Sequence, residues 1–401
     1  MGQYISKSVQ QGIAIAIAFL IVIPFKSKAQ KDTTTWKDKF EVRGYLKSMH
    51  ILNIWDGDST LSDNFFHNRL NFRYYANENW TMGLEVRNRL FYGETKQAFG
   101  KFYTLNIDQD PGVVDMAWPL IDSRSFLLHS MIDRAWIDYS DDKWSIRIGR
   151  QRINWGQNLV WNPNDLFNVY NFSDFDYEER PGSDAIKIQR YFKKLRSLEF
   201  VYKITNTFRK DIFALKYMFN WKSYDVQLIG AKVEQDVALG LGWAGNIKYA
   251  GFKGEATYFH PYENLMDTTG ILVTSMSVDY TFKNETFLTA SVFYNSGGVD
   301  SPKALNNPNL FAGSTSSPKT LMPNQLSWFV QYSGQLNPLL TAGGTVIYAQ
   351  GINIVFFMPN LGYSISDSWD IGLFAQSYFG EISGPFRNLG NGVFLRTRWS
   401  F

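Results

Sequence analysis

Most of this chain alternates between apolar and polar residues with a period of two, and it shows no helical period of useful length. The pattern is clear in residues 80–87, WTMGLEVR, and again in residues 275–282, SMSVDYTF. A period of two is typical of a β-strand whose two faces meet different surroundings, because successive side chains point to opposite sides. The sequence therefore predicts an all-β chain.

The connections between these segments alternate between short and long. Short turns are predicted at residues 77–79, 141–142, 193–194, 222–223, 250–251, 283–284, 335–338 and 366–367. Longer loops are predicted at residues 93–126, 154–183, 261–270, 297–324 and 380–391. Short turns at one end of the strands and long loops at the other are the layout of outer-membrane barrels.

The strand count and the composition agree with that layout. With a first strand at residues 40–54 and a last at residues 392–401, the chain holds about eighteen strands, an even number as bacterial barrels have. Aromatic residues make up 17% of the chain, and many lie beside the turns, as in an aromatic girdle. In lipid only helices or closed barrels satisfy the backbone, and a mean hydropathy of −0.24 is unlike a helical membrane protein. The predicted fold is a transmembrane antiparallel β-barrel of the outer membrane with a long lumen-inserted loop.

The N-terminus carries the long apolar run of the chain, residues 12–25, which Lys7 precedes and a small-x-small pattern at residues 27–29 follows. At about fourteen residues the run is short for a transmembrane helix, which needs roughly twenty. We therefore predict a cleaved signal peptide at residues 1–29, a short periplasmic leader at residues 30–39 and the barrel at residues 40–401.

Composition excludes several functions. The absence of Cys removes disulfides, thiolate catalysis and thiolate metal sites. A net charge of +3 without a basic run argues against nucleic acid as a partner.

The last strand alternates fully and ends on an aromatic residue. Trp399 and Phe401 share one face with apolar residues, and Arg396 and Arg398 share the other. A final amphipathic strand that ends in Phe resembles the signal read by the barrel assembly machinery. Trp399 and Phe401 would be that signal here. The predicted partners are therefore this machinery and the lipid and lipopolysaccharide of the outer membrane of a Gram-negative bacterium.

Alternation also assigns residues to the lumen, because a charge that faces lipid at the midplane costs roughly 2–4 kcal/mol. The predicted substrate and ion pathway consists of arginines: Arg69, Arg73, Arg87, Arg89, Arg147, Arg396 and Arg398. Two interpretations stay open. The arginines either lower the barrier for anionic or hydroxyl-rich solutes, or pair with carboxylates of an inserted loop. Those carboxylates would be Asp174, Asp176, Glu178 and Glu179.

The stretch between two strand signals near residues 144–149 and 186–189 is aromatic, polar and aperiodic. Long irregular segments in a compact domain are usually functional, so residues 154–183 are predicted to form a constriction or plug loop in the lumen. The residues predicted to anchor it are Arg150, Gln151, Trp155, Gly156, Trp161, Asn162, Pro163 and Asp165.

Residues 148–167, IGRQRINWGQNLVWNPNDLF, resemble a motif of porin-like barrels in the alginate-export group and related uncharacterised outer-membrane families. The matching positions are Gly149, Arg150, Gln151, Trp155, Gly156, Asn162, Pro163 and Asp165. The resemblance implies an eighteen-stranded channel whose arginine-rich lumen passes anionic polysaccharide or small organic solutes. The style of the leader, with Gln30 after the cleavage site, resembles that of a Bacteroidota protein.

Catalysis and metal binding have weaker signals. His67, with Asp63 nearby, and His260 are the candidates for a hydrolase site, but neither lies in a catalytic motif. The acidic residues of Asp108-x-Asp110 and Asp174-x-Asp176-x-Glu178 could bind calcium, although such acids are more often solvated or paired with arginine. We predict no enzymatic activity, no cofactor and no metal site.

The predicted function is a porin-like outer-membrane channel for small anionic or sugar-like solutes, constricted by residues 154–183. The alternative is a plugged barrel without a transport role, which serves as a structural subunit of an outer-membrane assembly or surface complex. In that case its long loops would bind an outer-membrane protein partner.

Overall fold

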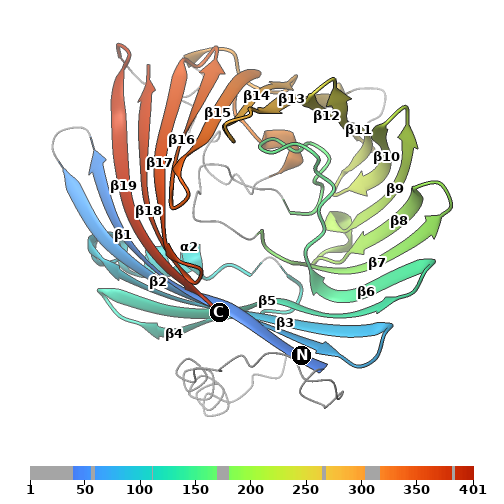
Figure 1. The fold of residues 1–401 in the computed structure, drawn as a ribbon, viewed down its shortest axis with the longest axis horizontal. Helices are drawn as coiled ribbons and strands as arrows, with labels where there is room; N and C mark the ends of the chain where they lie inside the picture. The colour runs from blue at the N-terminus through green and yellow to red at the C-terminus, as the bar shows by residue number, and fades with distance from the viewer. Residues whose placement is uncertain are drawn as a thin grey trace.

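The computed structural model describes residues 39–55, 59–110, 112–168, 180–263, 268–302, 317–381 and 384–401. It is a barrel of eighteen antiparallel strands, seen end-on in Figure 1. Strand order around the ring follows the chain, and β19 (Arg387–Ser400) pairs with β1 (Phe40–Trp55) to close it. The predicted antiparallel β-barrel and its strand number are confirmed. The predicted signal peptide and leader, residues 1–38, lie outside the described residues.

The remaining strands of the ring have the following bounds: β2 (Thr60–Tyr75), β3 (Trp80–Gly93), β5 (Phe126–Ser140), β6 (Trp144–Gln151), β7 (Ser183–Phe192), β8 (Arg196–Lys203), β9 (Ile212–Trp221), β10 (Tyr224–Val233), β11 (Asp236–Ile247), β12 (Ala250–Pro261), β13 (Ile271–Thr281), β14 (Phe287–Asn295), β15 (Leu326–Asn337), β16 (Leu340–Gln350), β17 (Ile354–Ser366) and β18 (Trp369–Gly380). Two short 3-10 helices, η2 (Phe208–Lys210) and η5 (Pro318–Thr320), lie in the connections.

The connection predicted as one loop at residues 93–126 contains two elements that the sequence did not reveal. Helix α2 (Glu94–Ile107) follows β3, and Gly100 interrupts it with φ 52° and ψ −122°. Each half is therefore too short to show a helical period. Strand β4 (Ala117–Asp122) pairs with β5 at residues 127–131, beyond the stretch 135–140 that pairs with β6. Strand β4 thus occupies the place beside β5 that the short β6 leaves empty.

The two ends of the barrel differ as predicted. The predicted short turns lie at the end where β1 begins and β19 finishes, although residues 250–251 open β12 and the turn before it is at residues 248–249. There the backbones of Gly44 and Phe401 exchange hydrogen bonds of 2.9 and 3.0 Å. The longer connections lie at the opposite end. At the short-turn end, aromatic rings pair across strands, including Trp80 with Tyr139 and Trp369 with Trp399, which is the expected aromatic girdle.

The two faces of the strands also follow the alternation. The outward face is apolar over most of the ring, and side chains such as Leu228, Leu239 and Leu241 are among the exposed large hydrophobic residues. The inward face carries the charged residues. Register pairs Arg69 with Arg87, and Lys47 with Arg398, so the members of each pair share one side of the wall.

Leu228 lies in the middle of β10 with 46% of its surface exposed on the outward face. Leu228→Arg is expected to lower the free energy of unfolding by about 2–4 kcal/mol, because it places a guanidinium at the bilayer midplane. Reversible urea unfolding in lipid vesicles measures this difference. Leu228→Ala is the matched control, because it removes the apolar side chain without adding charge. Equal destabilisation by the two variants would mean that this face does not meet lipid.

Candidate functional site

The connection between β6 and β7 contacts inward-facing side chains on the opposite part of the wall. Its described parts are residues 152–168 and 180–182. Figure 1 shows the first of these, in green, within the ring of strands. The four carboxylates at residues 174, 176, 178 and 179, which were predicted to pair with arginines, lie outside the described residues.

Glu255 on β12 is the main acceptor for this segment. Its side chain is fully buried. Its Oε1 accepts hydrogen bonds from the backbone N–H of Gln157 at 2.5 Å and of Asn158 at 2.8 Å. Its Oε2 accepts one from the backbone N–H of Asn164 at 3.0 Å. A buried carboxylate needs such partners because its desolvation is costly, and here three backbone donors of one segment supply them.

Two asparagines of the segment extend this attachment. Asn164 donates to the Leu241 carbonyl at 3.1 Å and accepts from Thr257 at 2.6 Å. It lies over Gly240 and Gly242, where a Cβ would come within 2.9 Å of the Asn164 side chain. Only glycine leaves room for this close approach.

Asn158 makes the corresponding contacts on the next strand. Its Nδ2 donates to the Ser275 carbonyl at 3.2 Å, and its Oδ1 accepts from the Ser277 hydroxyl at 2.7 Å. The segment is therefore attached to three consecutive strands, β11, β12 and β13.

Two buried tryptophans, both predicted as anchors, hold the segment at separate places. Trp155 donates from Nε1 to Glu199 on β8 at 2.6 Å, and Lys216 lies 3.3 Å from the same carboxylate. The Lys216 ammonium is also 4.9 Å from the centre of the Trp155 ring. Trp161 packs instead against Phe293 and Phe329, with ring centres 5.3 and 6.0 Å apart. One tryptophan thus joins a charged pair, and the other an apolar cluster.

Other predicted anchors act within the segment itself. A Cβ on Gly156 would come within 2.3 Å of the Asn162 side chain, so the chain crosses itself closely here. Pro163 is buried. Asp165 pairs with Arg180 on the returning arm. Burial raises the pKa of the Asp165 carboxyl to about 6, although Arg180 acts in the opposite direction.

Arg150 and Gln151 lie at the neck of the connection, where β6 ends and β7 begins. Arg150 is bound by Asp184 at 2.8 Å and by Asp110 at 2.7 Å, so it also ties down the connection that leads into β4. The Gln151 amide donates to the carbonyls of Arg147 and Ala185, both at 3.0 Å. These two residues fix the ends of the segment rather than its docked part.

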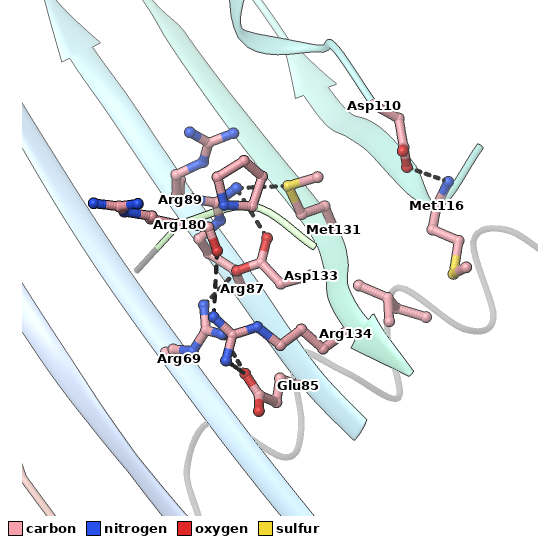
Figure 2. Close-up of polar contacts among 12 residues, drawn as sticks. Arg69, Glu85, Arg87, Arg89, Asp110, Met116, Met131, Asp133, Arg134 and Arg180 are labelled. Atoms are coloured by element: carbon pink, nitrogen blue, oxygen red, sulfur yellow. Dashed lines mark hydrogen bonds and ion pairs between the residues drawn. The ribbon is translucent and has the colours of Figure 1, made fainter. Parts of the chain in front are cut away.

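A network of buried ion pairs lies on the inner wall of β2, β3 and β5 (Figure 2). Arg69, which is 1% exposed, pairs with Glu85 at 2.5 Å and with Asp133. Arg87 lies 3.0 Å from Asp133, and Arg134 lies 3.1 Å from Glu85. Arg69 and Arg87 therefore pair with carboxylates, as the second interpretation predicted. These carboxylates belong to the barrel wall and not to the inserted loop.

The network also reaches the docked segment. Arg134 donates to the backbone carbonyl of Arg180 at 3.2 Å. Asp133 and Arg134 were not predicted from the sequence. They are adjacent charged residues between Met131 and Trp136.

The remaining predicted pathway arginines have varied surroundings. Arg147 lies 2.7 Å from Asp138 and stacks on Trp136 at 4.1 Å. Arg396 lies 3.4 Å from Asp370. On the inward faces of β18, β19, β1, β2 and β3, cations outnumber carboxylates. The cations are Arg43, Lys47, Arg69, Arg73, Arg87, Arg89, Arg396 and Arg398, and the carboxylates are Glu41, Asp63, Glu85 and Asp370.

Two lumenal cavities of about 310 Å³ each lie beside these elements. The first lies between β1–β3 and α2, and His67, Arg89 and Phe91 line it. The second lies between the tip of the docked segment and strands β15–β18. The described part of the segment therefore occupies one side of the lumen and leaves space along the other.

The candidate catalytic and calcium residues have structural contacts. His67 packs between Tyr45 and Phe65, with ring centres 5.2 and 5.5 Å away. Asp108 lies 3.1 Å from His129, and Asp110 contacts Arg150. No cluster of three potential metal ligands is found within the described ranges, and the acids at residues 174–178 lie outside them. The absence of catalysis stays a prediction.

No family model matches the chain, and no curated protein matches it. Its fold does match solved structures. A BenF-like porin from Pseudomonas fluorescens Pf-5 has a TM-score of 0.58 and 9% identity over 91% of this chain and 99% of that one. OccK5 (OpdH) from Pseudomonas aeruginosa has a TM-score of 0.56 and 10% identity, covering 90% and 98%. OccAB4 from Acinetobacter baumannii has a TM-score of 0.55 and 11% identity, also covering 90% and 98%.

At these identities the similarity concerns the fold. The fold is that of outer-membrane porins, and the likeness extends over nearly the full length of those chains. This agrees with the prediction that the protein lies in the outer membrane of a Gram-negative bacterium. The predicted Bacteroidota source and the resemblance to the alginate-export group stay predictions from the sequence.

Glu255→Gln is expected to loosen the docked segment, because the amide keeps the size of the side chain but loses the charge that three backbone N–H groups share. A hydrogen bond to a charged group is worth about 1.5–3 kcal/mol. Limited proteolysis of the folded protein should then cut within residues 152–168, where wild type resists. Glu263→Gln is the control, because that carboxylate is half exposed and pairs with Arg209 rather than with the docked segment. Equal resistance of all three proteins would contradict the role of Glu255.

Proposed function

We propose that this protein is a porin-like channel of the outer membrane for small solutes, constricted by residues 154–183. The observation that carries the proposal is the one-sided attachment of the segment. Residues 155–164 bind to the wall between β8 and β15, whereas one lumenal cavity lies beside the tip of the segment and the other lies against β1–β3. A channel needs a fixed constriction that leaves a passage, and this arrangement supports one.

The charge of the remaining wall supports a preference for anions. Cations outnumber carboxylates on the inward face from β18 to β3, although several arginines pair with wall carboxylates. Rings or ladders of Arg and Lys lower the barrier for anions in pores. The proposed solutes are therefore small and anionic or sugar-like. The pathway residues are the inward arginines of this wall, with Arg396 and Arg398 at the seam where the barrel closes.

The preference is tested with the double variant Arg396→Gln with Arg398→Gln. The anion-to-cation permeability ratio is expected to fall, because two positive charges leave the lumen. Reversal potentials across a planar bilayer under a salt gradient measure this ratio. The salt concentration should stay moderate, because at 0.1 M the ions already screen charges that lie more than about 10 Å apart. Lys193→Gln with Lys194→Gln is the matched control, since it removes two charges from an exposed short turn.

Unchanged reversal potentials in the lumenal variant would refute the anion preference while leaving a channel. A stably inserted but silent wild-type barrel would refute the channel itself. That result would favour the plugged structural subunit, and the next step would be to isolate a stoichiometric partner from the outer membrane.

A further inference from the structure

The second cavity differs in chemistry from the first, which charged side chains line. It lies between Leu159 and Val160 of the docked segment and the inner wall of β15–β18, and its volume is about 310 Å³. None of its lining residues carries a charge. The basic wall begins directly beside it, because the Arg396 guanidinium stacks 4.9 Å from the ring of Phe374, which lines the cavity.

Three polar side chains on neighbouring strands face this cavity. Gln331 on β15, Thr345 on β16 and Asn360 on β17 line it. In the part of the chain that the structure describes, none of the three side chains takes part in a hydrogen bond. Gln331 and Thr345 lie directly opposite each other in the ladder. Their donors and acceptors are therefore available to whatever enters the cavity.

Gln376 also lines the cavity, and its Oε1 accepts a hydrogen bond from the Tyr378 hydroxyl at 2.9 Å; the other lining groups are apolar. Leu159 projects from the tip of the segment and is 53% exposed. Met358 lies on β17, opposite Thr345, and Phe374 lies on β18, opposite Asn360. Thr345 and Asn360 thus each have an apolar neighbour one strand away, whereas Gln331 lies opposite Thr345, so an occupant meets both kinds of surface at once.

This combination selects a chemical class. An ion would lose hydration here without gaining a counter-charge, and a purely apolar molecule would leave amide and hydroxyl groups unpaired. A hydroxyl-bearing ring with an apolar face satisfies both surfaces. The volume lies at the lower end of the roughly 300–1,000 Å³ typical of small-molecule sites. We propose that the cavity is a solute subsite for an uncharged, hydroxylated ring of monosaccharide size, held by Gln331, Thr345 and Asn360.

The proposal deepens the proposed channel function and rests on it, but its test uses an uncharged probe. Glucose is added to a planar bilayer that contains single wild-type channels, and the open-channel current is recorded against glucose concentration. A bound sugar should reduce the current in a saturable way and add current noise. Glucose that stays outside the subsite should lower the current only in proportion to the conductivity of the bulk solution.

The test variant is Gln331→Leu with Asn360→Leu, which keeps side-chain volume and removes two hydrogen-bonding groups. The apparent dissociation constant for glucose is expected to rise about tenfold or more, because two side chains can no longer form hydrogen bonds with the sugar. Gln335→Leu is the matched control. It makes the same substitution on the same strand, outside the cavity, and should bind glucose as wild type does.

A wild-type current that follows bulk conductivity alone would overturn the subsite, as would equal glucose binding by wild type and the double variant. Neither result bears on the channel function, because conductance and anion preference are read without sugar. The leucine substitutions change no charge, so the reversal potential of the double variant should match that of wild type. A silent wild-type channel would instead refute the proposed function together with this inference.

Discussion

The closed ring of backbone hydrogen bonds is the constraint on which the rest of this structure depends. Lipid offers no partners to an open strand edge, so β1 pairs with β19 as well as with β2. Ring closure fixes which residues of β1 and β19 pair, and this pairing decides which side chains point to the lumen and which to lipid. A slip of one residue would turn Lys47 and Arg398, which lie opposite each other inside the barrel, towards lipid. The cost of such charges in the membrane therefore helps to hold the register.

Within the ring, buried carboxylates organise the two sides of the lumen in different ways. Glu255 and Glu199 take donors from the segment between β6 and β7 and hold it against β8–β13. Glu85 and Asp133 take guanidinium groups from their own part of the wall. Because a buried carboxylate must be satisfied locally, each collects the donors nearest to it. The lumen is thereby divided into a side with a docked segment and a side with excess positive charge.

Much of the fold could be predicted because it depends on local pattern. The inward position of Arg87 and Arg396, the short turns and the approximate strand number all follow from a period of two and from turn residues. Prediction failed within residues 93–126, where Gly100 divides a helix into halves too short to show a period. The candidate site was predicted unevenly. Trp155 and Trp161 were predicted as anchors and both contact the wall, whereas Glu255, the acceptor for three backbone donors, was not predicted.

The sequence by itself determined which face of each strand meets lipid and which meets the lumen, because alternation is a property of neighbouring residues. Only the tertiary structure decided which charges and amides meet across the lumen. Glu255 binds Gln157 across 98 residues of sequence, and Arg69 binds Asp133 across 64. Such pairs depend on the distances that ring closure imposes, and on small inward residues such as Gly240 that leave space for a side chain to dock. The local sequence pattern predicts neither these distances nor the positions where a side chain can dock.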